Sequence, residues 1–264
     1  MVRGGARGRP AAKAEPRQAF KAHTAVTMDG VAAPAQLRPV TPRAKAAVAC
    51  FVLTCLLILA SIWHDIAFLG LIQRVAGHQA TQAEAAALDS AETWIARGYL
   101  LTLIVTAVVF CMWLHRSYSN LVRAGTAGLK YTARRAVEAF FIPFVNLVRP
   151  YRVVAETWGA SSTLATGREV PPSERRADVH WLVGVWWISM LLGNGYGRVA
   201  AARLEGAKTL GDYQSYAYQS ITAHVVTLIA AVSIIVIIRT ITEWQERARE
   251  SGGLGMAHPE AQLR

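Results

Sequence analysis

The sequence lacks the short motifs that mark the common enzyme classes. It has no GxSxG nucleophile turn, no HExxH metal site and no Gly-rich phosphate loop followed by Lys-Ser or Lys-Thr. Its three cysteines, Cys50, Cys55 and Cys111, lie in apolar segments, form no CxxC pair and have no histidine at zinc spacing. The sequence therefore nominates no catalytic residue, no metal ligand and no cofactor site, and we expect a protein that is not an enzyme.

Acidic residues are also scarce. The chain has 17 Asp and Glu residues against 28 Lys and Arg residues, a net charge of +11, and 53% of its residues are hydrophobic. This combination is typical of membrane proteins, in which apolar and basic residues occupy separate segments. Because the basic residues flank apolar runs and no DNA-binding motif is present, we interpret the charge as a topology signal and expect no nucleic-acid partner.

Four apolar segments are long enough to be considered as membrane spans. Residues 46–63 form an uncharged run of about 18 residues, which as a helix crosses a hydrocarbon core of roughly 30 Å. The third segment is short and rich in tryptophan, so it needs neighbouring helices to hold it. The sequence predicts an all-α membrane protein, a four-transmembrane-helix bundle with spans at about 46–63, 95–114, 181–196 and 220–238.

The remaining segments are polar. Residues 1–43, rich in Ala, Arg, Pro and Gly, are predicted to be a disordered basic tail, and Met28 is an alternative start. Residues 44–245 form the predicted membrane domain, with 73–93 as an external, partly helical loop, and 246–264 form a second tail.

Basic residues are distributed unevenly between the connections. The first carries only Arg74 and Arg97, whereas residues 115–179 carry ten Lys and Arg residues. The positive-inside rule therefore predicts a multi-pass protein of the cell membrane with both termini and the long connection in the cytoplasm.

The long connection contains an apolar patch, 137–148, that Pro143 interrupts and that is too short to cross a bilayer. We expect an interfacial or re-entrant elbow over residues 137–158. Around it lies a cluster of candidate structural or lipid-contact residues. Its members are Trp113, Arg116, Asn120, Pro143, Asn146, Arg149, Pro150, Arg152, Glu156 and Trp158.

Two readings of this cluster remain open. In the first, the cluster pins the elbow against the second span, with Arg152 and Glu156 paired at i and i+4. In the second, Arg116, Arg149 and Arg152 bind an anionic lipid headgroup or a phosphate.

The stretches "MWLHRSYSNLVRAG" and "VEAFFIPFVNLVRPYRVVAETWGASS" and the paired tryptophans at 186 and 187 carry a resemblance. They are similar to a family of bacterial, largely actinobacterial membrane proteins known as domain of unknown function 4328. The similarity covers roughly residues 46–240. It implies a multi-pass membrane protein without an assigned activity, and it transfers no catalytic residue.

Three functions are compatible with these features. The first is a non-enzymatic accessory or interaction component whose basic elbow contacts anionic lipid or a partner, including a second copy or another membrane protein. The second is a small transporter or channel subunit with a hydroxyl-lined path, whose candidates are Thr54, Ser61, Thr102, Thr106, Ser189, Thr227 and Ser233. The third is a membrane enzyme or electron carrier, for example one that binds haem through two histidine pairs, His64 with His224 and His115 with His180.

Overall fold

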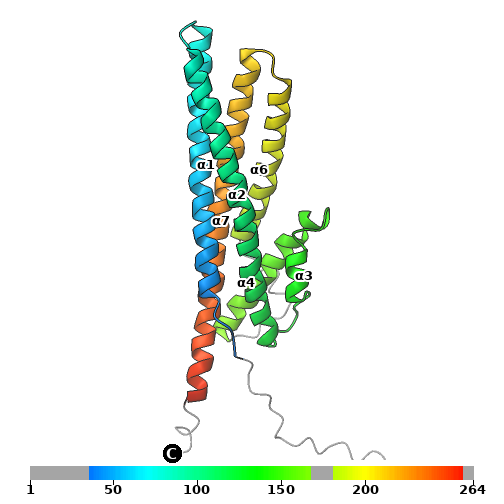
Figure 1. The fold of residues 1–264 in the computed structure, drawn as a ribbon. Helices are drawn as coiled ribbons and strands as arrows, with labels where there is room; N and C mark the ends of the chain where they lie inside the picture. Colours follow the sequence, from blue (N-terminus) through cyan, green and yellow to red (C-terminus); the bar gives the residue numbers. More distant parts are fainter. Residues whose placement is uncertain (1–35, 168–180, 258–264) are drawn as a thin grey trace, which may run out of the picture. The chain divides into compact units, whose positions relative to one another are not determined.

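The computed structural model describes residues 36–167 and 181–257, which lie within one compact unit that begins at Gln36. Within these two ranges every regular element is helical and no strand occurs, which confirms the all-α prediction. The elements, drawn in Figure 1, are α1 (Thr41–Ala76), α2 (Gln82–Arg123), α3 (Ala133–Glu138), η2 (Val145–Leu147), α4 (Arg149–Thr166), α6 (Trp181–Gly206) and α7 (Leu210–Ala257).

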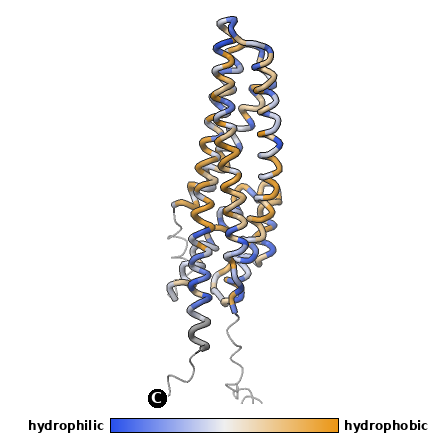
Figure 2. The backbone as a smooth tube through the Cα atoms, turned by 60° about the vertical axis from the view of Figure 1, so that its left-hand side comes forward, coloured by the Kyte–Doolittle hydropathy of each residue, from blue (hydrophilic) through white to orange (hydrophobic). Residues whose placement is uncertain are grey.

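Three of these helices, α1, α2 and the part of α7 from Leu210 to Gly252, are long and apolar enough to cross a membrane. Hydrophobic residues are concentrated along the middle of these helices and hydrophilic residues lie towards their ends (Figure 2). The helix that contains the third predicted span, α6, does not reach that apolar content because tryptophan, glycine and asparagine dilute its aliphatic residues. The predicted four-helix transmembrane bundle is therefore supported for three of its four helices.

Contacts at both ends fix the direction of the helices. At one end, here called the loop end, Asp65 of α1 contacts His224 of α7. At the opposite end, the tail end, Thr41 of α1 contacts Glu246 of α7. Because the contact order along α7 is reversed relative to α1, the two helices are antiparallel, and they lie side by side in Figure 1.

The first connection, predicted as a partly helical external loop over 73–93, is almost entirely helical. Only residues 77–81 lie outside helices, because α1 continues to Ala76 and α2 begins at Gln82. Thr81 and Glu84 form a capping box, in which the Thr81 hydroxyl accepts from the N–H of Glu84 and the Glu84 carboxylate accepts from the N–H of Thr81. The polar, Ala-rich sequence excludes the stretch from a hydrocarbon core, but it favours helix in water.

The predicted elbow is composed of α3, η2 and α4, which lie at the tail end. Pro150 occupies the first turn of α4, where its missing N–H costs nothing. The helix continues to Thr166, beyond the predicted end of the elbow at 158, and is capped by Gly167, whose φ of 63° is left-handed. The buried face of α4, which includes Val153, Val154 and Trp158, packs against α7 and α2.

The bounds of the two predicted tails also differ from those in the structure. The N-terminal tail over 1–43 falls outside the described residues up to residue 35, but Gln36 onward is described and α1 already begins at Thr41. At the other end, α7 runs through the boundary predicted at 245 without a break.

Candidate functional site

The polar residues at the tail end form a buried network around Asn120 and Gln245, each 1% exposed. Asn120 lies in the last turn of α2 and binds the backbone of Arg38 twice. Its Nδ2 donates to the Arg38 carbonyl at 2.8 Å, and its Oδ1 accepts from the Arg38 N–H at 3.1 Å. The Gln245 amide donates to the Ser117 carbonyl and to the Ser161 hydroxyl, and its oxygen accepts from Asn120. One network therefore joins α2, α4, α7 and the segment before α1.

The tryptophans of the predicted cluster are structural. Trp113 is fully buried and donates from Nε1 to Thr242 at 3.1 Å. Trp158 stacks edge-to-face on Trp244 with ring centroids 4.8 Å apart. Trp187 of α6 donates to the carbonyl of Leu147 in the elbow at 3.0 Å. These contacts join α2 and α4 to the tail end of α7, and α6 to the elbow.

Glu156 does not form the ion pair predicted with Arg152. It accepts instead from the hydroxyl of Tyr118 and from the N–H of Lys130 at 2.9 Å. Burial and the adjacent Glu156 carboxylate raise the pKa of Tyr118, which keeps the phenol protonated. Arg152 lies on the exposed side of α4 and is free to contact groups outside the bundle.

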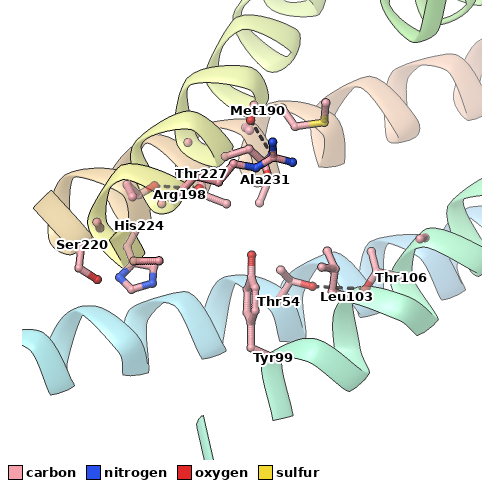
Figure 3. Close-up of a pocket in the computed structure, with 18 of the residues that line it drawn as sticks. Thr54, Tyr99, Leu103, Thr106, Met190, Arg198, Ser220, His224, Thr227 and Ala231 are labelled. Carbon is pink, nitrogen blue, oxygen red and sulfur yellow. Dashed lines mark hydrogen bonds between the residues drawn. The ribbon is translucent and has the colours of Figure 1, made fainter. Parts of the chain in front are cut away.

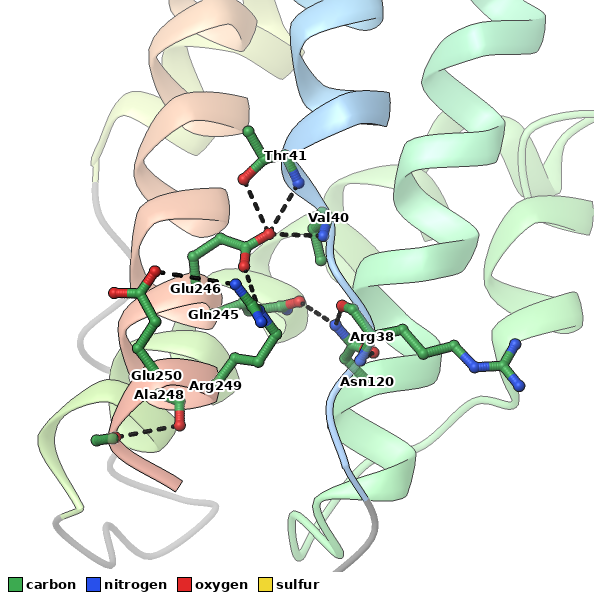
Figure 4. Close-up of polar contacts among 10 residues, drawn as sticks. Arg38, Val40, Thr41, Asn120, Gln245, Glu246, Ala248, Arg249 and Glu250 are labelled. Carbon is green, nitrogen blue, oxygen red and sulfur yellow. Dashed lines mark hydrogen bonds and ion pairs between the residues drawn. The ribbon is translucent and has the colours of Figure 1, made fainter. Parts of the chain in front are cut away.

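Sequence reasoning missed Glu246, which caps α1. The residue before α1, Val40, has no side chain able to satisfy the first N–H groups of the helix. Glu246 supplies this function, because its Oε1 accepts from the N–H of Val40 at 2.7 Å, the N–H of Thr41 at 2.9 Å and the Thr41 hydroxyl at 2.8 Å (Figure 4). Its Oε2 accepts from Arg249 at 2.6 Å. The contact joins residues 205 positions apart in the sequence.

Four arginines converge beside this network, at the start of α1 and the end of α2. Arg116 and Arg123 lie on either side of Asn120 along α2, and Arg38 is held to Asn120 by its backbone. Burial and the charges of Arg43, Arg38 and Arg123 lower the pKa of Arg116. None of the four takes part in a salt bridge within the described ranges. This tail-end arginine cluster (Arg38, Arg43, Arg116 and Arg123) is an uncompensated positive site.

The remaining predicted residues lie on the surface of the elbow. Pro143, Asn146 and Arg149 are exposed, whereas Pro150 is buried. Between α3 and α4 the apolar side chains also face outward: Phe141 is 67% exposed and Phe144 is 87% exposed. Phe144 has a φ of 61°, a left-handed conformation that is costly for a bulky residue. The elbow thus presents apolar side chains next to cations.

The sequence profile of a family described as a domain of unknown function (DUF4328) matches residues 76–243. The chain belongs to this family. The match covers α2 to most of α7, and it leaves out nearly all of α1 and the capping carboxylate Glu246. Among curated proteins and among solved structures, none matches this DUF4328 chain.

Two further predictions concern residues inside the bundle. Of the hydroxyls proposed to line a polar path, Thr54, Thr106 and Thr227 line a cavity between the helices. Several of the proposed hydroxyls also donate to carbonyls of their own helices, as Thr54 does to Cys50, Ser61 to Leu57 and Ser233 to Ile229.

Of the proposed haem ligands, His64 and His224 come together, but His64 contacts the carbonyl of Leu88 and His224 contacts Asp65. His180 lies outside the described residues. Within those residues no group of three or more His, Cys, Asp or Glu side chains could hold a metal ion.

Proposed function

We propose that this protein is a non-enzymatic membrane component with four spans, whose cytoplasmic end binds anionic lipid through the tail-end arginine cluster. The uncompensated positive charge of that cluster, at the boundary between the apolar stretches and the tail end, is the observation that carries the proposal.

The fourth span is α6. The chain enters α7 at the loop end, as the contact of His224 with Asp65 requires, but it leaves α2 at the tail end, where Asn120 meets Arg38. A helix between them has to return across the membrane. With 26 residues, α6 is about 39 Å long, enough to do so.

The positive-inside rule supports a cytoplasmic tail end. The arginine cluster, Arg134, Arg135, Arg149 and Arg152 all belong to this end or to its elbow. The outward-facing Phe141 and Phe144 suit insertion below the headgroups of the same leaflet, next to these cations. A phosphate bound between α1 and α2 would give the arginines of this cluster an anionic partner, which no carboxylate of the described residues provides.

The test compares retention of phosphatidylglycerol and phosphatidylcholine by the protein purified from a mixture of the two, measured by native mass spectrometry. Each cation near an anionic membrane surface is worth about 1 kcal/mol, so the double variant Arg43→Gln/Arg116→Gln should weaken phosphatidylglycerol binding by roughly thirtyfold. The double variant Arg149→Gln/Arg152→Gln is tested with the same measurement. It shows whether these two arginines of the elbow bind the anionic headgroup, as the sequence predicts.

The matched control, Arg203→Gln/Lys208→Gln, removes two charges at the loop end and should leave retention unchanged. Equal loss in the control and in the cluster variant would reduce the effect to net charge and refute a site. Undiminished retention in the cluster variant would refute it as well. Co-purification of a protein in place of lipid would identify the partner-binding alternative.

A further inference from the structure

A cavity of about 750 Å³ lies between the pair α1 and α2 and the pair α6 and α7. It exists because α6 packs along α7 but makes almost no close approach to α2. Gly193 brings α6 onto α7, since a Cβ atom there would lie 3.3 Å from the backbone nitrogen of Thr227 and still closer to its hydroxyl. In Figure 3, side chains from the two helix pairs face one another across the cavity.

The cavity is a long slot. On α2 its lining runs from Glu92 to Phe110 and on α7 from Tyr216 to Ile234, which at 1.5 Å per residue is about 27 Å on each helix. This length is close to the roughly 30 Å of a hydrocarbon core. The volume divided by the length gives a cross-section of a few tens of Å², on the order of one or two hydrocarbon chains.

The two ends of the slot differ in chemistry. Its tail-end floor is aromatic and aliphatic, with Phe110 and Phe140 packed edge-to-face at 5.6 Å above Trp186 and Ile234. Small residues such as Ala231 form its walls.

At the loop end the lining becomes polar, with Glu92, Tyr99, Arg198, Ser220 and His224, so that Arg198 is its cation and Glu92 its carboxylate. A second cavity of about 190 Å³ adjoins it, sharing Tyr99 and His224 and including the Asp65 carboxylate that binds His224 at 3.1 Å.

Arg198 is the only arginine among the described residues that line the cavity. It lies in α6 at the depth of the polar lining, and within residues 36–167 and 181–257 no carboxylate pairs with it. An arginine on the wall of a membrane cavity needs an anion or water to replace its lost hydration. Carboxylate and phosphate are the groups that its guanidinium binds most strongly.

We infer that the slot binds a long-chain amphiphile, with its hydrocarbon tail between α2 and α6 and its acidic head, a carboxylate or phosphate, on Arg198. The site for the acidic head is separate from the tail-end arginine cluster and lies in the other half of the bilayer. The inference rests on the proposed crossing of the membrane by α6. The accessibility of a cysteine placed at Ala207 tests this crossing independently of either lipid.

The experiment uses the full chain in phosphatidylcholine nanodiscs with a photoactivatable palmitate, which supplies the carboxylate, and a photoactivatable hexadecanol of equal length. Crosslinked peptides are mapped by mass spectrometry. Palmitate should label walls of the slot, such as Leu103 and Ala231, in preference to outward-facing positions such as Leu101 and Val232. Competition by palmitate or by lysophosphatidic acid shows whether carboxylate or phosphate is preferred.

Two variants give the decisive comparison. Ala231→Trp narrows the slot and should abolish labelling of its walls, whereas the neighbouring Val232→Trp faces away and should leave it unchanged. Arg198→Gln should weaken palmitate labelling by roughly tenfold and leave hexadecanol labelling unchanged, with Arg203→Gln as the charge control. If Ala231→Trp does not fold, the wild-type map and Arg198→Gln decide alone. Labelling confined to outward-facing positions would overturn the inference. It would also be overturned if Arg198→Gln changed neither the labelling by palmitate nor the labelling by hexadecanol relative to wild type.

Discussion

The contact between Glu246 and the start of α1 gives a prediction with a definite magnitude and pH dependence. Burial of the Glu246 carboxyl opposes its ionisation. Hydrogen bonds from Arg249, from the N–H groups of Thr41 and Val40, and from the Thr41 hydroxyl outweigh burial and lower the pKa of Glu246 from 4.5 to about 2. Each pH unit of such lowering corresponds to about 1.36 kcal/mol, so ionised Glu246 stabilises the folded state by about 3 kcal/mol at neutral pH.

Glu246→Gln keeps the shape of the protonated carboxyl and should lose this stabilisation. Because the folded pKa is depressed, the contribution is complete above the unfolded pKa of 4.5 and is lost as the pH falls through about 2. The difference in unfolding free energy between wild type and variant should therefore shrink from about 3 kcal/mol at pH 7 to about 1.4 kcal/mol at pH 3.

The assay is unfolding in mixed micelles of increasing SDS content, followed by circular dichroism at several pH values. Glu243→Gln, one turn earlier on α7, removes an exposed carboxylate paired with Arg247 and should change the free energy by less than about 0.5 kcal/mol. A Glu246→Gln deficit that matched this control, or that stayed constant between pH 7 and pH 3, would refute the capping role.

Two further variants test the packing of the bundle. Gly193→Val should push α6 away from Thr227 and destabilise the fold by about 1–3 kcal/mol in the same assay. Gly195 has open space around it, so Gly195→Ala should be neutral. Equal effects of the two variants would show that the close approach of α6 to α7 is unimportant. Gln245→Leu should cost about 2–4 kcal/mol because it removes three buried hydrogen bonds, and a stabilised variant would contradict the network.

Apolar length predicts three of the spans because lipid solvation depends on composition alone. Apolar composition does not show which face of each helix points inward. Both faces of a membrane helix are apolar, so the sequence lacks the amphipathic pattern that identifies the buried face of a soluble helix. Trp113 and Asn120 were nonetheless predicted as members of the cluster, and both are buried. They lie on one face of the helix near its basic end, where burying a polar side chain costs free energy unless it finds a partner.

The features that sequence reasoning missed depend on distant contacts. The third span was predicted to end at about residue 196, whereas α6 continues through the glycines at 193–197 to Gly206 and uses Gly193 for close packing. The pairing of Glu156 with Arg152 followed from helical spacing alone, yet Tyr118, from another helix, occupies that carboxylate. A local rule cannot anticipate a partner supplied by a different helix.

Reliance of the first helix on Glu246 has a consequence for biosynthesis. The ribosome makes Thr41 about 200 residues before it makes the carboxylate that completes the hydrogen bonds of Thr41. During translation the first turn of α1 therefore lacks this carboxylate until α7 has been synthesised. Completion of the start of α1 is tied to the synthesis of α7, and a nascent chain interrupted before Glu246 would keep a frayed first turn.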